Sequence, residues 1–572
     1  MKKRILSYFI CLGMMLSVPP TIVLAIEEQG LDVIVEKHGK CSWEEGVLKI
    51  KNLGEYTISG KSEQNRIEIC LDDSEKDKKD SLIINISNLN ISSDLSPIYI
   101  NNTQGHEITI NIIGINSLTS TSNAGIKKDI NETLIIKGRG SLDAYGGEIP
   151  ANDHASGFAG IEGSNITINC EPPEDKNLYN IKSTGNFLAA GIGGGYHYGK
   201  SSDGENIRII NGKIIANGGS SGAGIGGGYG GSGNHIEIIN GYIVATGGDF
   251  GAGIGGGDYG GAFNITIRNG TIIAEGKGGS AGIGSGSGSN AYNNIQIFGG
   301  NIKSTGSSFY FYSAPLGGGA GIGSGCIVED DDNISGTERK IIINGGNIKA
   351  YGGAKASGIG GGGNDIDFGL DNIYVEINGG TIEASGGKGA AGIGGGNFDF
   401  GNIKITNGEI TVTNSDEKEG TGIGGGKGAN VEISAGKVLF KNTRPINGTL
   451  KLSDSCNIYR RISKDSPEEK VSISGFDFTA LVAELKIVFE PESEISDKNN
   501  DLTGEHTPTN DSPNNSVSVQ SQTSNKTVES KITSSKVFKT GDNRNFLPIC
   551  GLVLTIFLVC IDFILKRFLI NN

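Results

Sequence analysis

A short tripeptide, Ala-Gly-Ile or a close variant, recurs through the middle of this chain and limits its possible folds more than any other pattern in it. Its isoleucine stands at Ile126, Ile161, Ile192, Ile225, Ile254, Ile283, Ile322, Ile359, Ile393 and Ile423, with gaps of 29 to 39 residues. A repeat of this period indicates units that bury their apolar residues only against their neighbours. We therefore expect a stack of similar units rather than a set of ordinary globular domains.

Apolar and polar residues alternate within each unit. In the unit that begins at Ile236, four inward residues follow spacings of two, five and two, with a turn at Asn240-Gly241. The same spacings recur in the units that begin at Ile207, Ile265, Ile341, Val375, Ile403 and Val431. A period of two indicates β-strands, and strands this short pair only if successive units lie on one another. The sequence predicts an all-β fold, a right-handed parallel β-helix (solenoid) of about ten or more coils.

Glycine supports this prediction, because 95 of the 572 residues are glycine. A collagen helix would need glycine at every third position and abundant proline, and the chain has only 13 prolines. In a β-helix, glycines at the corners supply positive φ angles and let neighbouring coils approach closely. Aromatic residues are only 6% of the chain, so we expect a thin core of isoleucine.

The N-terminal part of the body keeps short alternating strands but has fewer glycines. Its segments 54–60 (GEYTISG), 96–100 (SPIYI), 116–118 (NSL) and 134–142 resemble a bacterial family of β-helical carbohydrate-binding proteins. The AGIGGG repeat that follows is similar to tandem repeats of Gram-positive surface proteins. Together the resemblances cover about residues 45 to 445, and they imply a β-helical, exported protein with a carbohydrate as its class of ligand.

The two ends of the chain predict where the protein is located. Lys2, Lys3 and Arg4 precede an apolar run, and small residues end at Ala25, which is typical of a signal peptide cut after that residue. Residues 546–565 are long and apolar enough to cross a membrane, and Lys566-Arg567 follow, which favours a cytoplasmic tail and an external body.

A possible attachment signal stands just before this C-terminal segment. Lys539-Thr540-Gly541-Asp542 resembles the sorting signal of Gram-positive wall-anchored proteins, in which a transpeptidase cuts between threonine and glycine, here Thr540 and Gly541. The Leu-Pro of that family is replaced by Val537-Phe538. The resemblance implies attachment to peptidoglycan, and a plain membrane anchor is the alternative.

These signals divide the chain into six parts. We expect a signal peptide (1–25), an N-terminal β-helix part (26–150), glycine-rich β-helix repeats (151–445), a β-rich cap (446–492), a disordered stalk (493–545) and a single transmembrane helix (546–567). The expected location is the cell surface, on the extracellular face of a Gram-positive envelope.

Charge and cysteine content exclude several classes of function. The net charge of −14 argues against nucleic acid as a partner. Of the eight cysteines, Cys11, Cys550 and Cys560 lie in the apolar ends. The other five are widely spaced and odd in number, which favours neither a disulfide framework nor a zinc site.

Aromatic residues that follow the AGIGGG segments are the best candidates for a ligand site. They are Tyr196, Tyr198, Tyr229, Tyr259, Tyr292, Phe398 and Phe400, and two acidic residues, Asp258 and Asp399, are next to members of this set. Equivalent positions on successive coils lie above one another, so these rings are expected to line one edge of the stack, where a polysaccharide or a host matrix glycan would bind. Alternatively, the rings only cover a glycine-rich corner by packing on each other.

No cofactor is expected apart from possible calcium. Asp330, Asp331, Asp332, Asp365, Asp367 and Asp371 fall in loops of nearby units and could bind this ion, or could simply be solvated. Residues 194–201 match the phosphate-binding pattern GxxxxGK[ST], but that motif needs a helix after it, and the sequence predicts a strand.

Catalytic residues are not evident. Outward strand residues such as Arg208, Glu237, Thr266, Gln296, Lys404 and Glu432 are mixed in type, and no paired carboxylates stand out. We therefore predict a non-catalytic surface protein that binds carbohydrate. A structural scaffold or adhesin for protein ligands is the alternative, followed by a polysaccharide lyase or hydrolase.

Overall fold

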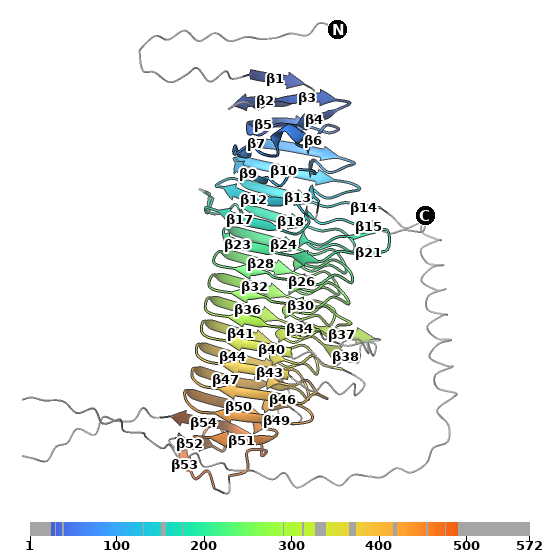
Figure 1. The fold of residues 1–572 in the computed structure, drawn as a ribbon. Coiled ribbons are helices and arrows are strands. Elements are labelled where there is room, and N and C mark those ends of the chain that lie inside the picture. The colour runs from blue at the N-terminus through green and yellow to red at the C-terminus, as the bar shows by residue number, and fades with distance from the viewer. Residues whose placement is uncertain are drawn as a thin grey trace, which may run out of the picture. The chain divides into compact units, whose positions relative to one another are not determined.

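The protein is a parallel β-helix of about 12 turns, of the right-handed type (Figure 1). The computed structural model describes residues 24–28, 30–36, 39–129, 131–149, 156–173, 175–289, 291–311, 314–326, 339–364, 373–415, 420–453, 456–474 and 476–489. The predicted β-helix is thus confirmed. The only helical element in these ranges is a 3₁₀ turn at Asp73–Glu75. No helix in them is long and apolar enough to cross a membrane, and the predicted stalk and anchor lie outside them.

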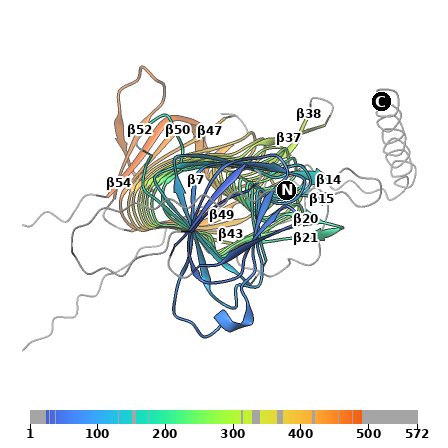
Figure 2. The same cartoon turned by 90° about the horizontal axis from the view of Figure 1, so that it is seen from above.

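A coil from the middle of the stack shows how the strands are arranged. It consists of β23 (Ile207–Asn211), β24 (Lys213–Asn217), β25 (Ile225–Gly226) and β26 (Gly233–Asn234). Each strand pairs in parallel with its counterpart on the next coil, for example Ile225 with Ile254. Figure 2 looks down the stack and shows these strands superposed along several sides. We number the strand series in this order.

Three of the four series run through most of the stack. The first comprises β9 (Glu107–Ile113), β12 (Thr133–Gly138), β17 (Ile166–Cys170), β23, β27 (Glu237–Ile238), β31 (Thr266–Ile267), β35 (Ile295–Ile297), β40 (Arg339–Ile343), β43 (Ile373–Ile377), β46 (Gly401–Ile405), β49 (Ala429–Ile433) and β51 (Thr449–Leu452). The second comprises β10 (Ile115–Ser120), β13 (Ser141–Tyr145), β18 (Ile181–Thr184), β24, β28 (Tyr242–Thr246), β32 (Thr271–Glu275), β36 (Asn301–Thr305), β41 (Asn347–Tyr351), β44 (Thr381–Gly386) and β47 (Glu409–Asn414). The third comprises β8 (Ile98–Ile100), β11 (Ile126–Lys128), β16 (Ile161–Glu162), β19 (Ile192–Gly193), β25, β29 (Ile254–Gly255), β33 (Ile283–Gly284), β39 (Ile322–Gly323), β42 (Ile359–Gly360), β45 (Ala391–Gly394) and β48 (Thr421–Gly424). The fourth is short and comprises β22 (Gly204–Glu205), β26, β30 (Ala262–Phe263) and β34 (Tyr292–Asn293).

The core is a set of isoleucine columns. Ile225, Ile254 and Ile283 lie above one another in the third series and are fully buried. The residues predicted to point inward in the first and second series are also buried, as in Ile207 and Ile214. Burying a side chain of this size contributes about 1.5–3 kcal/mol. The spacing of two, five and two therefore corresponds to the inward residues of two strands, one in the first series and one in the second, that are separated by a tight turn.

From β19 onward, a glycine follows the isoleucine of each third-series strand, and the stacking requires it. Gly255 has a φ of 135°, and a Cβ atom built on it would lie 2.0 Å from the carbonyl oxygen of Gly284 on the next coil. The same contact recurs between Gly226 and Gly255 at 1.9 Å. A side chain at this position would push neighbouring coils apart, which explains why the repeat keeps Ile-Gly here.

Both ends of the stack are closed by antiparallel strands. At the N-terminal end, β1 (Leu24–Glu28) pairs with β2 (Leu31–Glu36), and β2 pairs with β5 (Gly54–Ser62). There β3 (Cys41–Glu44) pairs with β4 (Val47–Ile50), and β6 (Arg66–Ile69) and β7 (Leu82–Ser93) begin the parallel stacking. At the C-terminal end, β50 (Lys437–Ile446) pairs with β54 (Val482–Phe489), followed by β52 (Cys456–Arg461) and β53 (Glu469–Val471). Such caps keep sheet edges from pairing with other chains.

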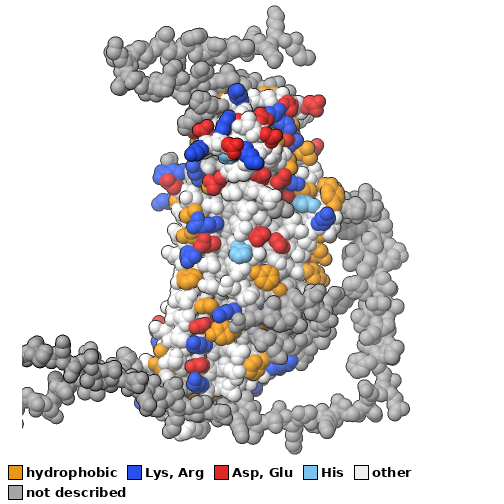
Figure 3. All heavy atoms as spheres, viewed as in Figure 1, with side chains coloured by type: hydrophobic (Ala, Val, Ile, Leu, Met, Phe, Trp, Pro, Cys, Tyr) orange, Lys and Arg blue, Asp and Glu red, His pale blue; other side chains and the backbone are white. Residues whose placement is uncertain are grey.

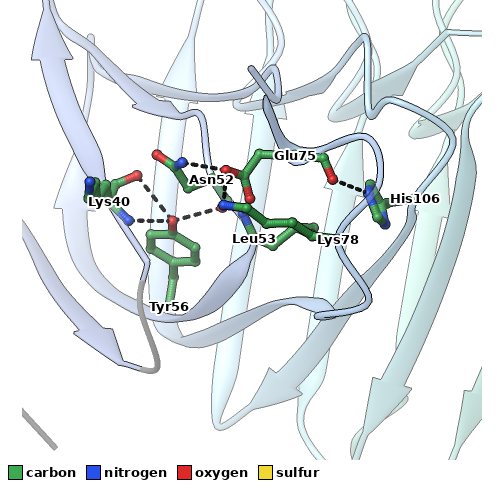
Figure 4. A network of polar contacts seen from close by, with 7 residues as sticks. All are labelled: Lys40, Asn52, Leu53, Tyr56, Glu75, Lys78 and His106. Carbon is green, nitrogen blue, oxygen red and sulfur yellow. Dashed lines mark hydrogen bonds and ion pairs between the residues drawn. The ribbon is translucent and has the colours of Figure 1, made fainter. Parts of the chain in front are cut away.

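A buried carboxylate fixes the loops of the first coils (Figure 4). Glu75 is 1% exposed and accepts hydrogen bonds from Asn52 Nδ2 at 2.7 Å, from Leu53 N at 3.1 Å and from Lys78 Nζ at 2.6 Å. Burial raises the pKa of Glu75, but these hydrogen bonds outweigh it and hold the pKa below its ordinary value. His106 Nε2 lies 2.9 Å from the Glu75 carbonyl oxygen and links the next coil.

Tyr56 joins this network from the core side (Figure 4). Its ring is fully buried, and its hydroxyl oxygen accepts the Lys40 N–H at 2.8 Å. The same hydroxyl lies 2.9 Å from the Asn52 carbonyl oxygen, which accepts its proton. The loops before β5 and the turn at Asp73–Glu75 are therefore tied to the first parallel coils by polar contacts.

Charged side chains are unevenly distributed on the stack. Figure 3 shows that they gather near the N-terminal end and in a column along one edge, whereas the middle of the visible face is mostly uncharged. Cys41, Cys70 and Cys170 are free thiols.

Candidate functional site

The first candidate site is a row of tyrosines on the segments that follow the third strand series, which we call the tyrosine edge: Tyr196, Tyr198, Tyr229 and Tyr259. The ring centroids of Tyr196 and Tyr229 are 5.3 Å apart at an interplanar angle of 86°, and those of Tyr229 and Tyr259 are 5.8 Å apart at 68°. Tyr198 is 64% exposed and Tyr259 is 45% exposed. The structure therefore brings Tyr196, Tyr229 and Tyr259 together, with rings on successive coils in edge-to-face contact, and Tyr198 lies in an exposed turn two residues after Tyr196.

The tyrosine edge begins on a small antiparallel sheet. This sheet consists of β14 (Glu148–Ile149), β15 (Ser156–Gly157), β20 (Tyr196–His197) and β21 (Lys200–Ser201), and it projects from the stack (Figures 1 and 2). Residues 194–201, which match the phosphate-binding pattern, thus form a hairpin rather than the start of a helix.

Tyr292 differs from the prediction, because its ring is 1% exposed and cannot contact a ligand at this edge. It stands nine residues after Ile283, whereas Tyr229 and Tyr259 follow their isoleucines by four and five. Tyr292 consequently enters β34 and pairs with Ala262, whose side chain also faces the core. Burial raises the pKa of the Tyr292 hydroxyl above its ordinary value.

Gly288 stands where the row of tyrosines would continue. A Cβ atom at Gly288 would lie 2.7 Å from the ring of Tyr259, so this ring packs directly over the glycine. The tyrosine edge therefore ends at Tyr259.

The two predicted acidic neighbours are both engaged within the protein. Asp258 is partly buried, and its carboxylate accepts a hydrogen bond from Ser221 Oγ at 3.3 Å. Burial raises the pKa of Asp258 to about 7. Asp399 is fully buried and accepts the Gly396 N–H at 3.0 Å, so it cannot reach a ligand. Phe398 and Phe400 are partly buried on the same loop, far along the chain from the tyrosine edge.

A histidine and a carboxylate lie beside the first tyrosines. His197 Nε2 is 2.9 Å from Glu162 Oε1, and Glu162 also accepts the Ala159 N–H at 3.1 Å. The ring of His197 packs on Phe158 with a centroid distance of 4.5 Å. These contacts hold the projecting sheet against the third strand series.

A second candidate site is a groove at the bend where the fourth series turns into the first, which we call the bend groove. Its volume is about 590 Å³. It is lined by Thr133, Asn165, Thr167, Asn206, Arg208, His235, Glu237, Asn264, Thr266 and Asn294. Five of these residues, Asn165, Asn206, His235, Asn264 and Asn294, have φ angles between 52° and 59°. Asparagine tolerates this backbone conformation better than most residues, which explains its recurrence at the bend.

Asparagine amides form a hydrogen-bonded ladder along the bend groove. Asn206 Nδ2 donates to Asn165 Oδ1 at 2.9 Å, and Asn294 Nδ2 donates to Asn264 Oδ1 at the same distance. A second groove of about 420 Å³ further along the first series repeats the pattern, since Asn430 donates to Asn402 at 3.0 Å.

The charged residues of the bend groove, Arg208 and Glu237, are paired with each other, and Arg268 outside the groove also pairs with Glu237. Arg208 Nε and Arg268 Nε lie 2.9 Å and 2.6 Å from the two carboxylate oxygens of Glu237. Their hydrogen bonds hold the pKa of Glu237 below its usual range. The sequence places Arg208 and Glu237 on outward strand positions but does not show that they share a groove. The sequence feature that indicates this groove is the asparagine directly before the first isoleucine of several units, as in Asn206, Asn264 and Asn294.

The comparison with known families supports the repeat. A model of the beta helix repeat family matches residues 236–258, 265–287, 295–326, 341–363 and 375–397. These five stretches are β-helix repeats. Each matched stretch begins at a fully buried residue of the inward pattern, namely Ile236, Ile265, Ile295, Ile341 or Val375. No match was found among curated proteins or among solved structures.

Several predicted residues cannot be placed. The calcium candidates Asp330, Asp331, Asp332, Asp365, Asp367 and Asp371, and the sorting-signal residues Thr540 and Gly541, lie outside the described residues. In the part of the chain that is described, no group of three or more His, Cys, Asp or Glu side chains could hold a metal ion. Ala25 lies in β1, where its backbone pairs with Ile34.

Proposed function

We propose that this protein is a non-catalytic carbohydrate-binding protein of the cell surface. The tyrosine edge is the observation that carries the proposal, because it presents partly exposed rings on successive coils. The face of an aromatic ring is electron-rich and attracts the polarised C–H groups on the flat side of a pyranose. A row of such rings suits a polymer of sugars better than a single small ligand.

The proposed location rests on the two ends of the chain. Residues 1–25 have the pattern of a signal peptide, and residues 546–567 that of a membrane anchor, with a polar stalk between this anchor and the β-helix. The sorting-like motif at Thr540-Gly541 would allow covalent attachment to peptidoglycan instead. In either case the tyrosine edge would face the surroundings of the cell.

The non-catalytic part of the proposal is supported by the acids near the tyrosine edge. Hydrolysis of a glycosidic bond commonly needs two carboxyl groups on either side of the bond. Asp258 is hydrogen-bonded to Ser221, and Glu162 is held by His197 and by the Ala159 N–H. These carboxylates have structural partners and do not form a pair across an open cleft.

A glycan array tests the proposal with the full chain. We expect reproducible binding to at least one polysaccharide, and loss of that binding in a Y229A/Y259N variant. Asparagine is chosen at position 259 because the φ of Tyr259 is 59°, which disfavours alanine. The control is Y242A, since Tyr242 is 40% exposed on β28 and not part of the tyrosine edge. Equal binding by all three proteins would refute a role for the tyrosine edge.

A second candidate function is an adhesive scaffold that binds a protein. The observation that favours it is the projecting hairpin of β37 (Ser308–Phe311) and β38 (Ala314–Gly318), on which Tyr310 is 61% exposed. A scaffold of this kind would give no reproducible signal on the glycan array.

A further inference from the structure

We infer that the bend groove is a second binding site, which holds an extended, neutral, β-linked polysaccharide chain parallel to the axis of the stack. The site shares no residue with the tyrosine edge, so it goes beyond the function proposed above. Binding at one site can therefore be refuted by experiment while binding at the other is supported.

The geometry of the bend groove matches a polymer rather than a small molecule. Thr133, Asn165, Asn206, His235, Asn264 and Asn294 stand at the same bend on successive coils. Neighbouring parallel strands are about 4.8 Å apart, so equivalent polar groups recur at about that interval. A β-1,4-linked pyranose chain is an extended ribbon with a comparable length per sugar. Each coil can therefore meet one sugar of a chain that lies along the groove.

The groove offers hydrogen-bonding groups suited to hydroxyls. An asparagine amide carries two N–H donors and two acceptor lone pairs. The ladder uses one N–H of Asn206 and one of Asn294, and the other N–H of each is available to a ligand. Thr167 and Thr266 add hydroxyl groups on outward positions of the first series.

Charge favours a neutral ligand. The charged groups that line the bend groove are one arginine and one glutamate, Arg208 and Glu237, and they form an ion pair with each other. Arg268 also pairs with Glu237 and is not available to bind an anion. The whole chain has a net charge of −14, which repels polyanions such as polyuronates over long distances.

An extended peptide fits the groove less well. Peptide strands bind mainly by adding to an open sheet edge, where backbone N–H and C=O groups are unpaired. Here the strands below the groove, β23, β27 and β31, pair with neighbours on both sides. The groove therefore offers side chains rather than backbone groups.

Isothermal titration calorimetry of the full chain tests the inference with four neutral hexasaccharides. Xylohexaose, cellohexaose and chitohexaose are β-linked and extended, and maltohexaose is the α-linked, coiled control. We expect at least one β-linked hexaose to bind, maltohexaose not to bind, and affinity to rise steadily from disaccharide to hexasaccharide.

Two double variants locate the binding. N206G/N264G removes two amides and keeps residues that accept a φ near 55°, and T167V/T266V removes two hydroxyls with little change of shape. We expect the Kd to rise about tenfold in each, because several hydrogen bonds to the ligand are lost. The matched control is N442G, since Asn442 is exposed, has a φ of 48° and lies outside the groove.

The outcomes separate the two sites. Failure of all three β-linked hexaoses to bind, or equal Kd values for the protein and both groove variants, would overturn the inference. Binding that is lost in Y229A/Y259N and kept in both groove variants would also overturn it, while supporting the tyrosine edge. Loss in the groove variants with unchanged melting temperature would support it.

Discussion

Substitution of Gly255 by alanine tests whether close stacking of the coils dictates the Ile-Gly pattern. The new Cβ atom would lie 2.0 Å from the Gly284 carbonyl oxygen and 2.9 Å from its carbon. Gly284 is held in turn by the coil below it, so the clash cannot be relieved by one side chain. Overpacking costs about 1–3 kcal/mol, and the positive φ adds about 1–2 kcal/mol. We expect G255A to lower the free energy of unfolding by about 2–5 kcal/mol.

Gly105 provides the matched control, because it has a φ of 84° and no heavy atom within 4 Å of the position of a Cβ. G105A should therefore cost only the conformational part, about 1–2 kcal/mol. The assay is urea denaturation followed by circular dichroism, with the midpoint and slope compared among the three proteins. Equal losses in G255A and G105A would show that stacking contributes nothing, and the reasoning would be refuted.

Three further predictions concern the core and two acids. Ile254→Ala should cost about 2–5 kcal/mol in urea denaturation because Ile254 is fully buried, whereas Ile115→Ala should change stability by less than about 0.5 kcal/mol because Ile115 is 63% exposed. The pKa of Glu75 is lowered in the folded protein. The ionised carboxylate therefore stabilises the fold above its ordinary pKa, and this stabilisation is lost as the pH falls through the pKa of the folded protein. The melting temperature of E75Q should therefore lie below that of the unmodified protein at pH 7, and the gap should narrow in acid. The pKa of Asp258 is raised to about 7, so the folded state keeps a proton that the unfolded state has lost, and stability should fall as the pH rises towards 7. D258N should remove this fall in the melting temperature, and an identical pH profile would contradict the assignment.

The inward face of the β-helix could be predicted from the sequence because it depends on short-range spacing. Ile207, Ile209 and Ile214 follow a period of two on either side of a fixed turn, and the pleat of a strand then decides which side chains are buried. The register between coils follows, since a shift by one residue would expose every isoleucine.

The candidate sites were less predictable, because they depend on where each loop meets the next strand. The sequence predicts that Tyr229 and Tyr259 share one edge, as the structure shows, whereas Tyr292 is buried because its distance from the following Ile295 decides its position. The bend groove cannot be predicted in this way, because the bend depends on the positive φ at Asn206 and its equivalents, and the alternation of apolar residues carries no information about that angle.

The antiparallel strands at the two ends have a consequence for how such a protein can change in evolution. Since each middle coil contacts only the coils above and below it, a duplication or deletion of one whole unit leaves both terminal closures intact. The length of the molecule can therefore vary while the fold of each coil stays the same. The number of sugars that a groove along its side could span would vary with that length. Loss of β52–β54, by contrast, would leave an open lower rim on which a second chain could polymerise.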